Sequence, residues 1–331
     1  MKKSIISLVL LFITLNAFNQ VITGAVYDVI DKKPITFAYI YISGTMVATN
    51  SDQDGLFKLD ISKYPAMPLT ISALGYYQIT LNDFSKVKPP AIFLTPRIFE
   101  LSEVVVSDKS LARARKANLK LFRSSFLGKT PNGLLSTILN ENDIHFIYDK
   151  SDTVKAYSSA PLIIENRGLG YIVTFFLDEF EYDSRNKSWF FLGNILFNED
   201  MNMEEALKQR YERRRRNAFM GSKMHFFRAL WKNELESAGF QVRDNSGNSL
   251  NQKDFVIEGD SVIKYLWYPE KLLIYYRTDQ PPSSIDFKQD EVYFEKSGFY
   301  DALGIIWGGP MSKQLIGDWL PYEYTLPEEN P

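Results

Sequence analysis

The sequence predicts an all-β, seven-stranded sandwich in its N-terminal part, followed by an α+β domain with a mostly antiparallel sheet. Between Val21 and Val106, short alternating or β-branched segments recur with Gly, Asp and Pro turns between them. At 331 residues the chain is long enough for two hydrophobic cores. From residue 108 onward, segments with helical periodicity occur between longer strands.

Polar turns separate the predicted strands of the sandwich. Phe57, Leu59 and Ile61 recur with a period of two and therefore point to one face of a strand. The turn before them combines Asp52 with Gly55, residues that favour tight turns. The expected strands span residues 24–27, 35–42, 47–49, 57–61, 69–73, 77–81 and 91–94.

Several motifs of this region occur together in one known module. They are GAVYD at 24–28, PITFA at 34–38, ISGT at 42–45, SDQDGLF at 51–57, LGY at 74–76 and LSEVVV at 101–106. With them, residues 20–107 resemble the carboxypeptidase regulatory-like domain, a prealbumin-like sandwich found in TonB-dependent receptors and other envelope proteins of the Bacteroidota. The resemblance implies a fold and an envelope location. It implies no peptidase chemistry, because this module is appended to certain metallocarboxypeptidases and is not their catalytic domain.

The first residues predict a secretory signal peptide. Lys2 and Lys3 precede an apolar stretch at 5–15, and the small residue Ala17 lies before a plausible cleavage site at Gln20. Removing residues 1–19 takes away two of the 38 basic residues, which changes the formal net charge from -2 to -4. We expect an exported protein of the periplasm or outer membrane, with no transmembrane helix after cleavage. A mildly acidic chain of this kind is a poor partner for nucleic acid.

The remainder is predicted as a basic helical linker at 108–127 and an α+β domain at 128–331. An alternative role for the linker is contact with anionic lipid or lipopolysaccharide. The predicted helices are 203–218 and 222–238, the second ending at Gly239. The predicted strands are 144–148, 154–158, 162–165, 170–180, 188–197, 240–242, 255–257, 262–268, 272–276 and 291–294. This part resembles the uncharacterised domain that follows the sandwich in short secreted Bacteroidota proteins.

No catalytic residue, metal site or cofactor is predicted. The chain has no cysteine, which excludes disulfides and thiolate catalysis. Asn50, Asp52 and Asp54 match the start of a calcium loop, but Ile61 occupies the twelfth position, where a bidentate Glu is required. Only His145 and His225 are present, and neither begins an H-x-x-E motif, so a metallocarboxypeptidase site is excluded.

The densest run of charge is RRRR at 213–216. One interpretation is a solvated helix whose arginines pair with Glu204, Glu205 or Glu212. The other is an anion site in which arginines and a helix start near Ser222 receive phosphate or carboxylate. The candidate anion-binding residues are Arg213, Arg214, Arg216, Ser222, His225 and Arg228.

Aromatic residues in the C-terminal loops are candidates for contact with sugars. Trp307, Trp319 and Tyr322 lie in such loops, and each is equally compatible with a role as a buried anchor.

The sequence therefore predicts an exported envelope protein with a non-catalytic binding or structural role, its partner being an envelope protein or a surface glycan. The alternatives are a carbohydrate-active or other hydrolytic enzyme, and recognition of phosphate or lipopolysaccharide by the second domain. The oligomeric state is left open.

Overall fold

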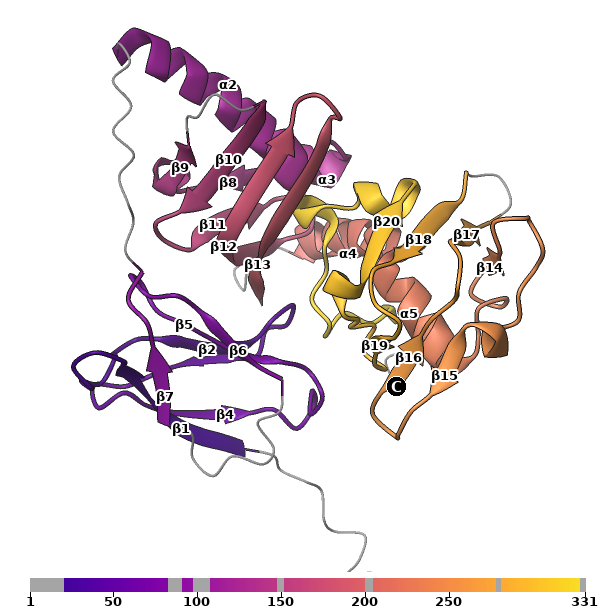
Figure 1. Cartoon of the computed structure of the whole chain (residues 1–331), viewed down its shortest axis with the longest axis horizontal. Helices are drawn as coiled ribbons and strands as arrows, with labels where there is room; N and C mark the ends of the chain where they lie inside the picture. Colours follow the sequence, from indigo (N-terminus) through magenta and orange to yellow (C-terminus); the bar gives the residue numbers. More distant parts are fainter. Residues whose placement is uncertain are drawn as a thin grey trace, which may run out of the picture. The chain divides into compact units, whose positions relative to one another are not determined.

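The computed structural model describes residues 21–82, 91–97, 108–147, 152–199, 205–277 and 281–327, so the predicted signal peptide lies outside the described residues. The chain forms two compact units (Figure 1). The first comprises Met1–Ile42, Val47–Ala73 and Gln78–Thr95. The second comprises Pro96–Pro331 together with the short segments Ser43–Met46 and Leu74–Tyr77.

The first unit is the predicted sandwich. Its described residues form one sheet of order β4-β1-β7 and a second of order β3-β2-β5-β6, which confirms seven strands in two sheets. In β4, Phe57 and Leu59 are buried while Leu56, Lys58 and Asp60 are exposed, as the period of two predicts. The strands are β1 (Val21–Asp28), β2 (Tyr39–Ile42), β3 (Ala48–Asn50), β4 (Leu56–Asp60), β5 (Leu69–Ser72), β6 (Ile79–Leu81) and β7 (Ala91–Leu94).

The second strand is shorter than the sequence predicts. A continuous strand was expected over 35–42, but β2 begins only at Tyr39, because Phe37 has a left-handed backbone with φ of 57°. The buried hydroxyl of Ser51 holds this bend. It donates to the carbonyl oxygen of Ile35 at 2.7 Å and accepts from the amide of Ala38 at 2.9 Å.

The first half of the second unit is an antiparallel sheet with a long central strand. β12 pairs with β11 through residues 171–175 and with β10 through residues 180–183, while β13 follows it along the opposite edge. β8 lies beyond β11, and β9 lies beyond β10. The elements are α2 (Asp108–Phe126), α3 (Pro131–Leu134), β8 (Ser136–Ile138), β9 (Ile144–Ile147), β10 (Thr153–Ser158), β11 (Leu162–Asn166), β12 (Tyr171–Asp183) and β13 (Ser188–Glu199).

The helix at the predicted linker belongs to this half. Phe122 and Phe126 of α2 are fully buried in the core of the sheet, and the ring of Phe126 lies 4.9 Å from that of Phe175. The exposed basic residues Arg113 and Lys116 lie on another side of the helix. The four-residue spacing of the two phenylalanines places both on one face, so α2 is an integral helix of the second unit.

The second half packs two small antiparallel sheets against a helix. The sheets have the orders β14-β17-β18-β20 and β15-β16-β19. The elements are α4 (Glu205–Phe219), α5 (Lys223–Lys232), β14 (Phe240–Arg243), β15 (Val256–Glu258), β16 (Lys264–Leu266), β17 (Leu272–Tyr276), β18 (Ser283–Phe287), β19 (Val292–Phe294) and β20 (Ile305–Gly308). Short 3-10 turns occur at 141–143, 252–254, 302–304, 310–313 and 316–318.

Helices α4 and α5 connect the two halves of this unit. Ala218 and Phe219, at the end of α4, belong to the core of the six-stranded sheet, whereas Phe226, Phe227 and Leu230 of α5 belong to the second core. α5 ends at Lys232, seven residues before the predicted Gly239 stop, because Asn233 takes the left-handed conformation and caps it. Over the part of the chain that the structure describes, every helix is too short or too polar to cross a membrane.

Candidate functional site on helices α4 and α5

The arginine run of α4 is divided between the interior and the solvent. Arg213 and Arg216 are exposed, and Arg214 is half-buried. Arg215, which was not among the predicted anion-binding residues, is buried with 9% of its surface exposed. Consecutive helical residues differ in direction by about 100°, so one of the four points into the protein.

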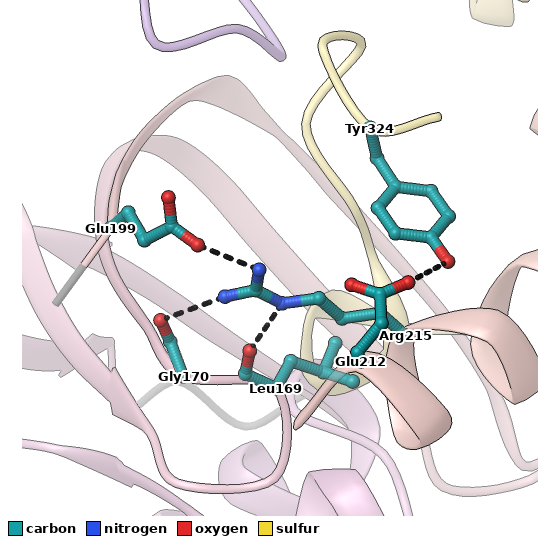
Figure 2. A network of polar contacts seen from close by, with 6 residues as sticks. All are labelled: Leu169, Gly170, Glu199, Glu212, Arg215 and Tyr324. Atoms are coloured by element: carbon teal, nitrogen blue, oxygen red, sulfur yellow. Dashed lines mark hydrogen bonds and ion pairs between the residues drawn. The ribbon is translucent and has the colours of Figure 1, made fainter. Parts of the chain in front are cut away.

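Arg215 is fully engaged by the protein itself (Figure 2). Its Nη1 lies 2.6 Å from Oε1 of Glu199, and its Nε donates to the carbonyl oxygen of Leu169 at 2.8 Å. Nη2 donates to the carbonyl oxygen of Gly170 at 3.3 Å. The guanidinium also lies over the ring of Tyr171. These contacts tie α4 to the β11–β12 turn and to the end of β13, so Arg215 is a structural residue.

Glu212, one of the acids expected to pair with the arginines, has another partner. Its Oε1 accepts a hydrogen bond of 2.8 Å from the hydroxyl of Tyr324 (Figure 2). Burial and then the nearby Glu212 carboxylate raise the pKa of Tyr324 well above its ordinary value. Tyr324 therefore stays protonated and donates. The side chains of Glu204 and Glu205, the other two expected partners, lie outside the described part of the structure.

Three arginines form a basic face on α4. Arg210, Arg213 and Arg214 are spaced by three and four residues, which places their side chains next to one another. Arg214 reaches the carbonyl oxygens of Arg167 and Gly168 only at 3.5 Å, the limit of a hydrogen bond. We call Arg210, Arg213 and Arg214 the basic face of α4.

The acids around the basic face are engaged elsewhere. Glu165 lies 2.8 Å from Arg167, Glu199 binds Arg215 and Glu212 binds Tyr324. Among the described side chains, no carboxylate forms an ion pair with Arg210 or Arg213. Glu212 keeps its negative charge because the hydroxyl of Tyr324 is neutral, so the three arginines and Glu212 together leave a net positive charge.

The start of α5 does not extend this charge. The hydroxyl of Ser222 caps the helix by accepting from the amide of His225 at 3.0 Å. Nδ1 of His225 accepts from the amide of Gly221 at 3.1 Å. Burial and the nearby Arg228, Arg277 and Lys232 lower the pKa of His225 to about 4, so the ring is neutral near pH 7.

Arg228 is also used within the fold. Its guanidinium donates to the carbonyl oxygens of Ser297 at 2.7 Å, Tyr324 at 2.6 Å and Tyr322 at 3.0 Å. It thereby ties α5 to the C-terminal segment. Of the six predicted residues, Arg213, Arg214 and Arg216 are on α4 and accessible, while Ser222, His225 and Arg228 serve the structure around α5.

A buried carboxyl group that the sequence did not indicate lies in the same region as Arg228. Glu295 has only 2% of its surface exposed and accepts a hydrogen bond from the hydroxyl of Ser297. Burial raises the pKa of Glu295. The carbonyl of Ser297 in turn binds Arg228.

Of the three aromatic residues predicted in loops, Trp307 lies instead in strand β20, where it pairs with Ile285 of β18. All three make contacts within the fold. Nε1 of Trp307 donates to the hydroxyl of Tyr300, and Nε1 of Trp319 donates to the carbonyl of Gln314, both at 3.1 Å. Trp319 packs against the core of the six-stranded sheet, and Trp307 packs against the second core. Tyr322 is in ring contact with Phe299.

Asp52 and His145, which the sequence analysis considered for calcium and zinc sites, both form hydrogen bonds within the fold. Oδ1 of Asp52 accepts from the amides of Asp54 at 3.0 Å and Leu56 at 2.8 Å, which is a turn that uses its own carboxylate. Nε2 of His145 lies 3.1 Å from Oγ of Ser159 on the exposed edge of β9. That histidine–serine pair was not predicted, because its members come from different parts of the sheet and form no motif.

Comparison with known proteins identifies the sandwich alone. Residues 22–106 match the family model described as a CarboxypepD_reg-like domain, which contains neither α4 nor α5. No curated protein matches the chain.

Among solved structures, a 9R-lipoxygenase from Cyanothece PCC8801 matches with 13% identity and a TM-score of 0.18. The match covers 66% of this chain and 48% of that one, so the chain spans about half the length of the lipoxygenase chain. A likeness this weak carries no argument about fold or activity.

Proposed function

We propose that the protein is an exported, non-catalytic binding protein of the cell envelope, and that the basic face of α4 binds phosphate-bearing anions. The observation that carries the proposal is the net positive charge of that face, where Arg210 and Arg213 form no ion pair with a described side chain. Arg210 and Arg213 are exposed beside Arg214, and the surrounding carboxylates are held by Arg167, Arg215 and Tyr324.

The chemistry of the face suits phosphate. An arginine side chain presents a planar fork of N–H donors that matches two phosphate oxygens at once. Side chains three and four residues apart are about 5–6 Å apart at their Cβ atoms, so several can contact one multiply charged group. The anchoring of α4 through Arg215 fixes the orientation of the helix that carries them.

The envelope location rests on two features of the first part of the chain. The basic and apolar residues before Gln20 resemble a signal peptide. The sandwich matches a CarboxypepD_reg-like domain, and the resemblance described above connects that module with envelope proteins. We therefore propose the phosphate groups of lipopolysaccharide as the ligand.

The decisive experiment measures binding of the full chain to vesicles with and without lipopolysaccharide. The test variant is Arg210→Gln, Arg213→Gln, Arg214→Gln. The matched control is Arg113→Gln, Lys116→Gln, Lys120→Gln, which removes the same charge from exposed positions on α2. We expect the α4 variant to lose about tenfold or more in affinity, and the control to bind like the wild type. Equal loss in the two variants, or no loss in the first, would contradict the proposal.

Competition with inorganic pyrophosphate separates phosphate recognition from general attraction. A phosphate site is competed by pyrophosphate more strongly than by chloride at equal ionic strength. Nonspecific attraction falls equally with both salts, because it depends only on screening.

A hydrolytic activity is the second candidate, and the pair formed by His145 and Ser159 is the observation that favours it. The Nε2–Oγ distance of 3.1 Å is within the range in which an imidazole can accept a serine proton. A fluorophosphonate reagent would label Ser159 if the serine is activated, with Ser159→Ala as the control. The absence of labelling at Ser159 would remove this candidate.

A further inference from the structure

The longest edge strand of the second unit is covered along only part of its outer edge. Residues 43–46 of the same chain bind the edge at 195–197, and residues 188–193 form the open part. β13 contains 12 residues and pairs with β12 along its length. Within the described strands, none pairs with the opposite edge of residues 188–193. The other two edge strands of this sheet are β8 with three residues and β9 with four. Short edge strands limit unwanted pairing, and β13 lacks that protection.

The composition of β13 offers no other protection. Residues 188–198 contain no Lys, Arg, Asp, Glu or Pro, the residues that usually keep an edge from accepting another strand. Large apolar side chains are exposed there. The exposed fractions are 40% for Trp189, 49% for Phe190 and 39% for Leu192.

The alternation of the strand separates a core face from an open face. Phe191, Ile195 and Phe197 contact the core of the sheet, with the ring of Phe191 at 5.1 Å from that of Phe126. Phe190 and Leu192 therefore lie on the other face. The register places Phe190 next to Glu181, whose carboxylate is paired with Lys155 at 2.6 Å. The same register places Leu192 next to the exposed Glu179, so one acidic side chain flanks the apolar residues.

We infer that this edge is the dimerisation surface of the protein, at which a second copy adds its own β13 antiparallel to the first. Two identical strands related by a two-fold axis form such a pair without any other adaptation, because every hydrogen bond is made twice. Residues 188–193 of the open edge carry no charge, so self-pairing brings no like charges of this segment together, while a charged partner strand would find no complementary charge on it. Phe190 and Leu192 of the two copies would contact one another across the axis.

This surface is separate from the basic face of α4 and does not depend on the proposed anion binding. Residues 188–193 of the two copies would form a short antiparallel ladder that joins the two six-stranded sheets. The second copy would be recognised through backbone hydrogen bonds along the strand edge. Trp189, Phe190 and Leu192 would supply the apolar area that becomes buried.

The first test is sedimentation velocity of the full chain over a wide range of concentrations. We expect a monomer–dimer equilibrium. Leu192→Lys should weaken it by about tenfold or more in Kd, because it places a charge at the edge. Thr137→Lys is the matched control, since Thr137 is exposed on the opposite edge strand β8, and it should leave the Kd unchanged. A wild-type chain that stays monomeric, or a dimer unaffected by Leu192→Lys, would overturn the inference.

The second test remains informative if Leu192→Lys fails to fold. Because the chain has no cysteine, single cysteines introduced at each of residues 188–193 report contacts between copies without background. Only positions next to the two-fold axis bring the two sulfurs within disulfide range. We expect oxidation to link at least one of these variants and not Thr137→Cys. Crosslinking at residue 137 alone, or at none of the positions, would contradict dimerisation through β13.

Discussion

The guanidinium carbon of Arg215 lies 4.1 Å from the ring centroid of Tyr171. This stacking places the positive charge over the negative face of the ring, while Glu199 binds its edge at 2.6 Å. The plane of the guanidinium thus contacts an aromatic ring, and its N–H groups have acceptors. These interactions allow a charged residue to be buried. The contact joins the middle of α4 to the first residue of β12.

Replacing Arg215 with Ala should destabilise the second unit by about 2–3 kcal/mol, because the carbonyls of Leu169 and Gly170 lose their donors. The measurement is urea unfolding followed by tryptophan fluorescence. All five tryptophans of the chain lie in the second unit, so the signal reports that unit alone.

The neighbouring arginine is the control for this change. Arg213→Ala removes the same charge from an exposed position and should change the free energy of unfolding by less than about 0.5 kcal/mol. Similar losses for Arg213→Ala and Arg215→Ala would show that charge rather than burial determines the effect. Glu199→Gln should cost only about 1 kcal/mol, because 39% of the Glu199 side chain is exposed.

The sandwich could be predicted from sequence because most of its strands carry their own signals. The alternation at Phe57 and Leu59, together with the turn at Asp52, identifies β4 without any knowledge of its partners. The strands β8, β18 and β20 were not predicted. Ser136–Ile138 is only three residues long, and Ser283–Phe287 begins with two serines, so their pairing depends on neighbours that are distant in sequence.

The site was less predictable than the fold. The sequence indicates an arginine-rich helix, but it does not show which of the four consecutive arginines is buried. The positions of the hydrogen-bond acceptors in the fold decide that. The acceptors of Arg215 include the carbonyls of Leu169 and Gly170, about 45 residues away, which have no side-chain signature. For the same reason Arg228 was predicted as an anion ligand, although three backbone carbonyls occupy its guanidinium.

The contribution of His225 to the stability of the second unit should decrease on acidification between about pH 6.5 and pH 4. The pKa of His225 is about 4 in the folded protein and has an ordinary value of 6.5. In this window the unfolded chain binds a proton that the folded chain excludes, so stability rises with pH and falls as pH decreases. The shift corresponds to about 3 kcal/mol across the window.

The pH dependence can be assigned to His225 by substitution. His225→Asn keeps an acceptor near Nδ1 for the amide of Gly221 but does not titrate. Its free energy of unfolding, measured in urea from pH 7 to pH 4, should vary by about 3 kcal/mol less than that of the wild type. His145→Asn, at the exposed histidine, is the control. Unchanged pH dependence in His225→Asn would contradict the assignment.

Phe37 should be a site at which the first unit can be stabilised. Its left-handed φ of 57° is unfavourable for a bulky residue, and 71% of its surface is exposed, so little burial compensates. Asn tolerates this conformation, and Phe37→Asn should raise the free energy of unfolding of the sandwich by about 0.5–1 kcal/mol. This unit lacks tryptophan, so its transition is the part of the circular dichroism signal that tryptophan fluorescence does not follow. A loss of stability would instead show that the exposed ring makes a stabilising contact.

The link between α5 and the C-terminal segment should depend on the fork of Arg228. Its guanidinium donates to three carbonyls, of Ser297, Tyr322 and Tyr324, and a lysine ammonium cannot reach all three from one position. Arg228→Lys should therefore cost about 2 kcal/mol in tryptophan-monitored urea unfolding. It should also speed chymotryptic cleavage near Tyr322, because local opening of the segment becomes easier. Arg210→Lys, at an exposed position of α4, is the control and should alter neither quantity. If Arg228→Lys lowers global stability while cleavage near Tyr322 stays at the wild-type rate, the arginine stabilises the core without specifically holding the C-terminal segment.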